Sequence, residues 1–67
     1  IEVIYILTEE SPRRTKVNFR SAGGIDVARI AATFGGGGHR CASGCFLGQP
    51  LPAAGDIVRR VIRKNLD

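Results

Sequence analysis

The chain has 67 residues, of which 43% are hydrophobic and 24% are charged, and ten Lys and Arg against six Asp and Glu give a formal charge of +4. This length allows one domain with one small core, and the ordinary balance of apolar and charged residues excludes an intrinsically disordered class. The longest apolar run, residues 3–7, is far too short to span a membrane. The excess of cations favours an anionic partner, although a basic surface without any partner gives the same excess.

The first residue and the cysteine content indicate the context of the chain. It begins with Ile1 and contains no methionine, so we expect a processed product or a fragment of a longer protein. Two cysteines are too few for a disulfide framework and are typical of a reducing compartment, where small buried thiols pack as ordinary residues. We therefore expect a cytoplasmic protein.

The first twenty residues predict a β-hairpin. Residues 2–8 are rich in β-branched and aromatic side chains, which is typical of a buried strand, and residues 9–13 form a polar turn. Residues 14–20 alternate strictly between an apolar and a polar face, as a half-exposed antiparallel strand does. The apolar face carries Thr15, Val17 and Phe19.

A helix is expected after this hairpin. Asp26 is a typical N-cap, and Gly35 occupies the position where a C-cap needs left-handed backbone. Between them, apolar residues recur at helical spacing: Val27, Ile30, Ala31 and Phe34. We expect the glycines at 35–38 to be irregular, because ordering four glycines costs a large backbone entropy.

The remainder predicts a short strand and a longer helix. Residues 44–48 have the character of a short buried strand, with room for one helical turn at 40–43, and a second helix begins near Ala53. Its apolar stripe consists of Ala54, Ile57, Val58, Val61, Ile62 and Leu66, and its basic side of Arg59, Arg60, Arg63 and Lys64. The expected class is α+β, a small mixed sheet with helices packed on it, in the order β-β-α-β-α.

The most informative segment is the glycine run followed by His39. Successive backbone N–H groups without side chains form concavities that bind anions, and a histidine donates a hydrogen bond or a charge to a phosphate oxygen. The run matches neither the Walker loop nor the dinucleotide fingerprint, because it leads into His39 and Arg40 and follows a helix rather than a strand. The alternative is a flexible connector.

Two other basic segments bear on an anionic partner. Arg20 and Ser21 end the second predicted strand, and a guanidinium binds phosphate oxygens in bidentate fashion. The alternative for this pair is a solvated strand end. The basic side of the second helix is expected to be solvent-facing surface or a contact with another part of the protein.

The sequence offers no self-sufficient catalytic or metal set. His39, Cys41 and Cys45 supply at most three ligands where structural zinc needs four, and a nucleophilic cysteine needs a histidine and an orienting group in space. Asp26 and Asp56 are both explained as residues of helix N-termini. We predict no metal ligand and no catalytic residue in this chain.

The segment FGGGGHRCASGC at 34–45, preceded by VNFRSAGGIDVARIAATF, resembles the C-terminal DHH-associated domain (first subfamily) of DHH-family phosphoesterases. It is most similar to the NrnA-like bifunctional oligoribonucleases and pAp phosphatases. RecJ exonucleases, cyclic di-AMP phosphodiesterases and alanyl-tRNA synthetases carry related domains. The resemblance implies that residues 1–67 are one substrate-binding domain of a two-domain protein, whose DHH domain holds two manganese ions with ligands outside this chain.

The resemblance also implies a set of site residues. The backbone of Gly36–Gly38 and the side chain of His39 would contact the phosphate or the terminal nucleotide, with Arg20 and Ser21 lining the same pocket. Arg40 keeps the charge of a lysine that is common in this motif, and Cys41 replaces a common polar residue. The predicted substrate-binding residues are Arg20, Ser21, Gly36, Gly37, Gly38, His39, Arg40 and Ser43.

The expected function is substrate binding in a metal-dependent hydrolase of short oligoribonucleotides (nanoRNA) or nucleotide phosphates such as pAp. By itself the fragment is expected to be inactive. The expected partners are that substrate and the DHH domain, with no membrane, and an oligomer is left open. The alternatives are a non-catalytic RNA- or tRNA-binding module that uses the basic helix, a cyclic dinucleotide phosphodiesterase domain, and a connector without a ligand.

Overall fold

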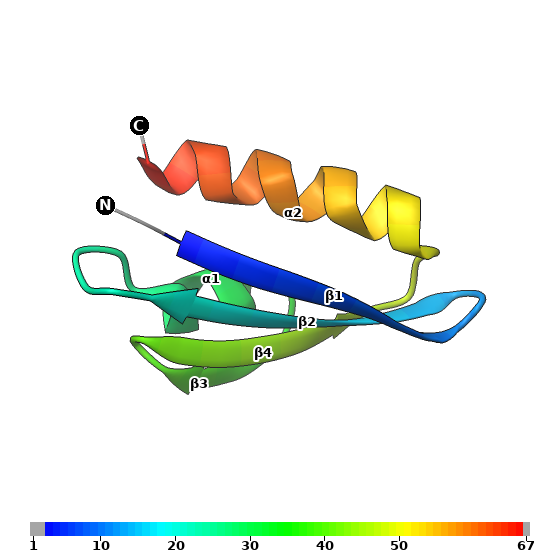
Figure 1. The fold of residues 1–67 in the computed structure, drawn as a ribbon, viewed down its shortest axis with the longest axis horizontal. Coiled ribbons are helices and arrows are strands. Elements are labelled where there is room, and N and C mark those ends of the chain that lie inside the picture. The colour runs from blue at the N-terminus through cyan, green and yellow to red at the C-terminus, as the bar shows by residue number, and fades with distance from the viewer. Residues whose placement is uncertain (1–2, 67) are drawn as a thin grey trace.

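Six elements make up residues 3–66, the part of the chain that the computed structural model describes (Figure 1). Strands β1 (Val3–Ser11) and β2 (Arg14–Ser21) form a hairpin, and helix α1 (Val27–Thr33) follows it. A second hairpin, β3 (Gly37–His39) and β4 (Ala42–Leu47), leads into helix α2 (Leu51–Leu66). The strands form one sheet in the order β1-β2-β4-β3, and every neighbouring pair is antiparallel.

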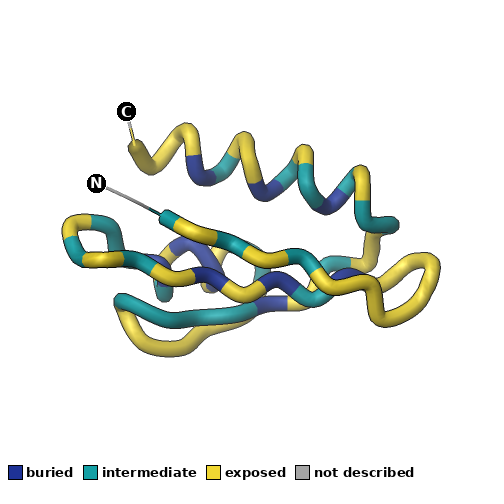
Figure 2. Tube along the Cα trace, viewed as in Figure 1, coloured by how far each residue is buried: buried dark blue, intermediate teal, exposed yellow. Residues whose placement is uncertain are grey.

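Alternation in β2 gives the sheet a covered face and an open face. Thr15, Val17 and Phe19 are fully buried, whereas Asn18 and Arg20 on the opposite face are exposed. Both helices lie on the covered face. The buried segments of the strands and of the helices therefore face each other and form one core layer between the sheet and the helices (Figure 2). The core residues supplied by the helices are Val27, Ile30, Ala31, Ala54, Val58 and Ile62.

Side-chain hydrogen bonds fix where the helices begin. The Asp26 carboxylate accepts from the N–H groups of Ala28 and Arg29 at 3.0 and 3.3 Å, which confirms Asp26 as the N-cap of α1. An N-cap of this kind stabilises a protein by about 1 kcal/mol. The hydroxyl of buried Thr15 donates to the Gln49 carbonyl at 2.9 Å, which ties the segment before α2 to the sheet.

The α+β class is confirmed, with one more strand than expected and a sheet that is antiparallel throughout rather than mixed. Residues 37–39 are a strand and not an irregular loop, because they pair with 42–44 of β4, and this pairing offsets the entropy of ordering the glycines. The helical turn considered at 40–43 is wrong: residues 40–41 form the hairpin turn. Within residues 3–66, neither helix is long and apolar enough to cross a membrane.

Candidate functional site

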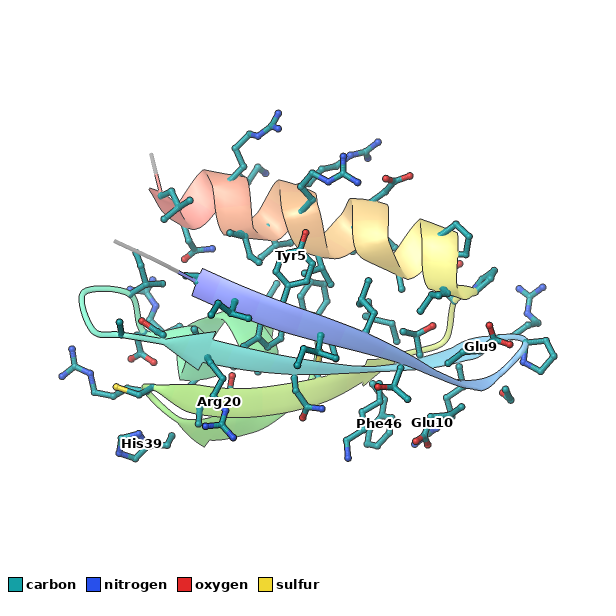
Figure 3. The ribbon with its side chains drawn as sticks, in the orientation of Figure 1. Tyr5, Glu9, Glu10, Arg20, His39 and Phe46 are labelled. Atoms are coloured by element: carbon teal, nitrogen blue, oxygen red, sulfur yellow. The ribbon has the colours of Figure 1, made fainter. Side chains whose placement is uncertain are left out.

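The open face places Arg20 and His39 in one row across the sheet. Arg20 pairs with Ala42 on one side and His39 pairs with Ala42 on the other, and directly paired residues of antiparallel strands share a face. Both side chains point away from the helices (Figure 3). Two strand spacings separate their backbones by about 10 Å. Since only the Ala42 methyl lies between them, the guanidinium and the imidazole flank an unobstructed strip of sheet.

A hollow of about 340 Å³ lies beside this row. Its floor is the cross-strand pair Gly37 and Gly44, which carries no side chains, and Asn18 and Arg20 contribute to its walls. A second hollow of about 440 Å³ lies between Arg20 and Ile4 and extends to Cys41. Arg20 lines both hollows, so its guanidinium is placed to contact a ligand that occupies either one.

The four glycines differ in what the fold requires of them. Gly35 has a φ of 81°, which confirms the left-handed backbone expected at the end of α1, directly after the C-cap Phe34. A Cβ on Gly36 would collide with the Gly44 carbonyl and with Cys45, and one on Gly38 would lie 2.7 Å from the Cα of Ser43. A Cβ on Gly37 would meet nothing within 4 Å. Packing therefore explains Gly36 and Gly38, and the left-handed backbone explains Gly35. Gly37 is the one whose missing side chain only keeps the open face clear.

His39 is oriented by its own hairpin. Its Nδ1 accepts the N–H of Cys41 at 3.1 Å, so the neutral ring carries its proton on Nε2. No hydrogen bond to Nε2 occurs within residues 3–66, and the side chain is exposed. The imidazole therefore presents an N–H donor to whatever lies on the open face.

The structure places two predicted site residues in structural roles. The Ser43 hydroxyl donates to the Val27 carbonyl at 2.6 Å and so points toward α1, away from the open face. The Ser21 hydroxyl accepts from the Gly23 N–H at 3.1 Å in a local turn, and Ser21 lines the larger hollow together with Arg20. Arg40 is exposed in the hairpin turn, where its carbonyl accepts the N–H of Val27 at 2.9 Å. Of the predicted set, Arg20, Gly37 and His39 share the open face, with Gly38 at its border.

Asn18, Ala42 and Gly44 also line the site, although sequence reasoning did not select them. The alternation of β2 was a sufficient signal for Asn18, because it puts that residue on the face of Arg20. No signal identified Ala42 and Gly44, because their place depends on the pairing of β4 with β3.

The charges of the site are available to a ligand. Within residues 3–66 the single ion pair joins Asp56 and Arg59 on α2, so none of the carboxylates in this range pairs with Arg20. On the covered face, burial raises the pKa of the Cys45 thiol above its ordinary 9.0, as expected of a packing residue. No three His, Cys, Asp or Glu side chains of the described residues lie close enough to hold a metal ion.

Comparisons with known proteins identify the family. Neither the curated proteins nor the solved structures gave a match. The sequence profile of the DHHA1 domain, however, matches residues 1–64, nearly the whole chain. The chain belongs to the DHHA1 family, the domain associated with DHH-family phosphoesterases.

Proposed function

We propose that this domain binds the phosphate groups of a short oligoribonucleotide, or of a nucleotide phosphate such as pAp, for an NrnA-like phosphoesterase of the DHH family. The observation that carries the proposal is the row that sets Arg20 and His39 on either side of a strip without bulky side chains. A phosphate is a compact anion with several acceptor oxygens, and donors that converge on one exposed stretch of backbone are what it needs.

Each part of the row has a distinct role in this proposal. The Arg20 guanidinium binds two phosphate oxygens at once, and His39 donates from Nε2. Gly37 lets the ligand approach the main chain closely. Because β3 is an edge strand of the described sheet, its outer side offers backbone N–H groups that no neighbouring strand uses.

The catalytic metal of such a hydrolase, manganese by the family resemblance, does not fit the residues of this domain, since the described part of the chain offers no cluster of ligands. We assign the metal to a DHH domain that acts together with this one. The contribution of the present chain is to bind and orient the substrate, and none of its residues is assigned a proton transfer or an attack on phosphorus. Two free thiols, Cys41 and Cys45, accord with a cytoplasmic location.

Calorimetric titration of the chain with pAp tests the proposal. We expect His39→Ala to weaken binding about tenfold or more, because a donor to a charged phosphate is lost. His39→Gln keeps an N–H donor and should retain part of the affinity. Gly37→Val should also weaken binding, because its side chain would fill the floor of the hollow while the fold leaves space for it.

Unfolding curves of the same variants provide the control, since all of them should remain as stable as the natural chain. Unchanged affinity in both His39→Ala and Gly37→Val would contradict the proposal. A cyclic dinucleotide presents the same phosphate chemistry, so its titration in parallel separates the linear from the cyclic substrate class.

An RNA-binding module that uses α2 is the second candidate. Arg59, Arg60 and Arg63 line a hollow of about 240 Å³ on the outer side of that helix, together with Asp56. Binding that depends on these arginines and is indifferent to His39 would favour this candidate.

A further inference from the structure

Phe46 is an aromatic side chain that the core does not use. It is 44% exposed and lies outside the core cluster. It pairs with Lys16 across β2 and β4, and this pairing puts it on the open face, where Figure 3 shows it pointing to the same side of the sheet as Arg20. Phe46 is the second-last residue of β4 and does not pack against the core, so its place on the face of the proposed phosphate site calls for another explanation.

Two cations accompany the ring. The Arg14 guanidinium carbon lies 4.1 Å from the ring centroid, and the Lys16 Nζ lies 5.9 Å from it. Nucleobases stack on aromatic rings and on guanidinium planes, while the phosphates on either side of a base are attracted by neighbouring cations. Phe46, Arg14 and Lys16 together supply both features.

The position of the ring relative to Arg20 sets the length of ligand that reaches both. Lys16, which faces Phe46, lies four residues before Arg20 on β2, a separation of about 13 Å along the strand. A mononucleotide held by its phosphate at Arg20 and His39 does not extend that far. A chain of several nucleotides does.

We propose that Phe46 and Arg14 form a base-stacking platform, so that the open face binds single-stranded oligonucleotides longer than a dinucleotide along β2 and β4. This inference rests on the proposed function, because it extends the ligand from the phosphate site at Arg20. The phosphate of one nucleotide binds at Arg20, and the base of another nucleotide, farther along the oligonucleotide, stacks on Phe46 and Arg14. It gives the domain a preference for length that the phosphate site alone does not provide.

Charge on the open face favours a nucleic acid as the occupant. Three cations, Arg14, Lys16 and Arg20, lie on this face, and Figure 3 shows Glu10 as an acidic side chain that points to the same side as Phe46. The exposed side chains of Ile4 and Ile6, at 60% and 58%, add apolar surface beside the cations. Apolar surface together with an excess of positive charge suits unstacked bases on an anionic backbone.

The test compares pAp with a single-stranded tetraribonucleotide, both titrated calorimetrically into the 67-residue chain. We expect Phe46→Ala to weaken tetranucleotide binding by at least about fivefold, the lower end for loss of one base–aromatic stack, and to leave pAp binding unchanged. Phe46→Trp should restore or strengthen the tetranucleotide affinity. Phe46→Leu, which keeps apolar surface but no aromatic face, should behave like Phe46→Ala.

The outcomes separate this inference from the proposed function. If His39→Ala weakens both ligands while Phe46→Ala weakens neither, the platform is refuted and the phosphate site stands. If Phe46→Leu binds like the natural chain, the side chain acts as apolar surface and the stacking proposal is refuted. If the chain dimerises and Phe46→Ala abolishes the dimer without changing RNA affinity, a second copy is the occupant instead. If neither ligand binds the natural chain, the proposed function itself fails.

Discussion

Two regions of this small domain are basic, and we propose only one of them, the open face of the sheet, as the phosphate site. The outer side of α2 holds the denser charge, with Arg59, Arg60, Arg63 and Lys64 within six residues. Its backbone is occupied by the hydrogen bonds of the helix, and Asp56 pairs with Arg59 at 3.2 Å, both side chains being more than 60% exposed.

The open face of the sheet has fewer cations, but they converge on exposed backbone. Arg20 and His39 flank Ala42, and the glycine pair beside them leaves the main chain uncovered. The comparison shows that the region with the densest charge is not the region where cations converge on uncovered backbone. We base the proposed phosphate site on the second feature, not on the first.

The largest effect is expected from Gly36, which holds β3 against β4 and so builds the open face. In Gly36→Ala the new Cβ would collide with the Gly44 carbonyl and with Cys45, and we expect a loss of about 3 kcal/mol or more in the free energy of unfolding. Gly37→Ala is the matched control, with open space at its Cβ, and should change stability by no more than about 0.5 kcal/mol. Urea unfolding measures both, and equal losses in the two variants would show that packing does not distinguish these glycines.

The next largest effect is expected from substitutions of Arg20, which should lower the affinity for pAp. We expect Arg20→Gln to weaken the affinity for pAp about tenfold, because a charged bidentate donor is replaced by a neutral one. Arg20→Lys keeps the charge without the paired N–H groups, so its affinity should lie in between. Calorimetry measures these affinities. If Arg20→Gln bound pAp as tightly as the natural chain does, the assignment of the phosphate site to the open face would be refuted.

On the covered face, the buried Cys45 thiol should make the stability of the fold depend on pH. Burial raises the pKa of the Cys45 thiol, so the folded state keeps a proton that the unfolded chain releases at a lower pH. The stabilisation from this thiol is complete below its ordinary pKa of 9.0 and is lost as pH rises through the folded value. Urea unfolding from pH 7.5 to 10.5 should therefore show a steeper alkaline loss in the natural chain than in Cys45→Ala. Parallel profiles would contradict this assignment.

The smallest effect is expected from the more highly charged region. Replacing Arg59, Arg60 and Arg63 together by glutamine should lower pAp affinity by no more than about threefold, because these exposed charges act on the open face only at long range. Raising the salt to 0.5 M should abolish that difference. A tenfold loss of pAp affinity that persists at high salt would show that the ligand binds at α2 rather than at the open face. It would favour the RNA-binding module on α2.

Local patterns predicted most of the fold. The alternation of β2, the N-cap at Asp26 and the left-handed position at Gly35 are each determined by neighbouring residues, and the structure confirms all three. Strand β3 was missed because its residues have little intrinsic strand propensity. They become a strand only through pairing with β4, a contact that propensity does not encode.

In the candidate site, too, some features are predictable from local sequence and others depend on how the strands pair. Sequence motifs selected Arg20 and His39 as separate candidates, and the register of three strands brings them into one row. Ser43 was selected with its motif, yet its hydroxyl is engaged by Val27 on the covered face. A motif indicates which residues occur together along the chain, whereas the pairing of strands decides which of them share a surface.

The most direct test of the phosphate site is an NMR titration of the isotopically labelled chain with pAp, followed through the backbone amides. We predict that the largest shifts occur at Arg20 and at residues 37–39, with residues 59–64 nearly unchanged. Shifts that are largest at 59–64, with 37–39 unmoved, would contradict the assignment of the phosphate site to the open face.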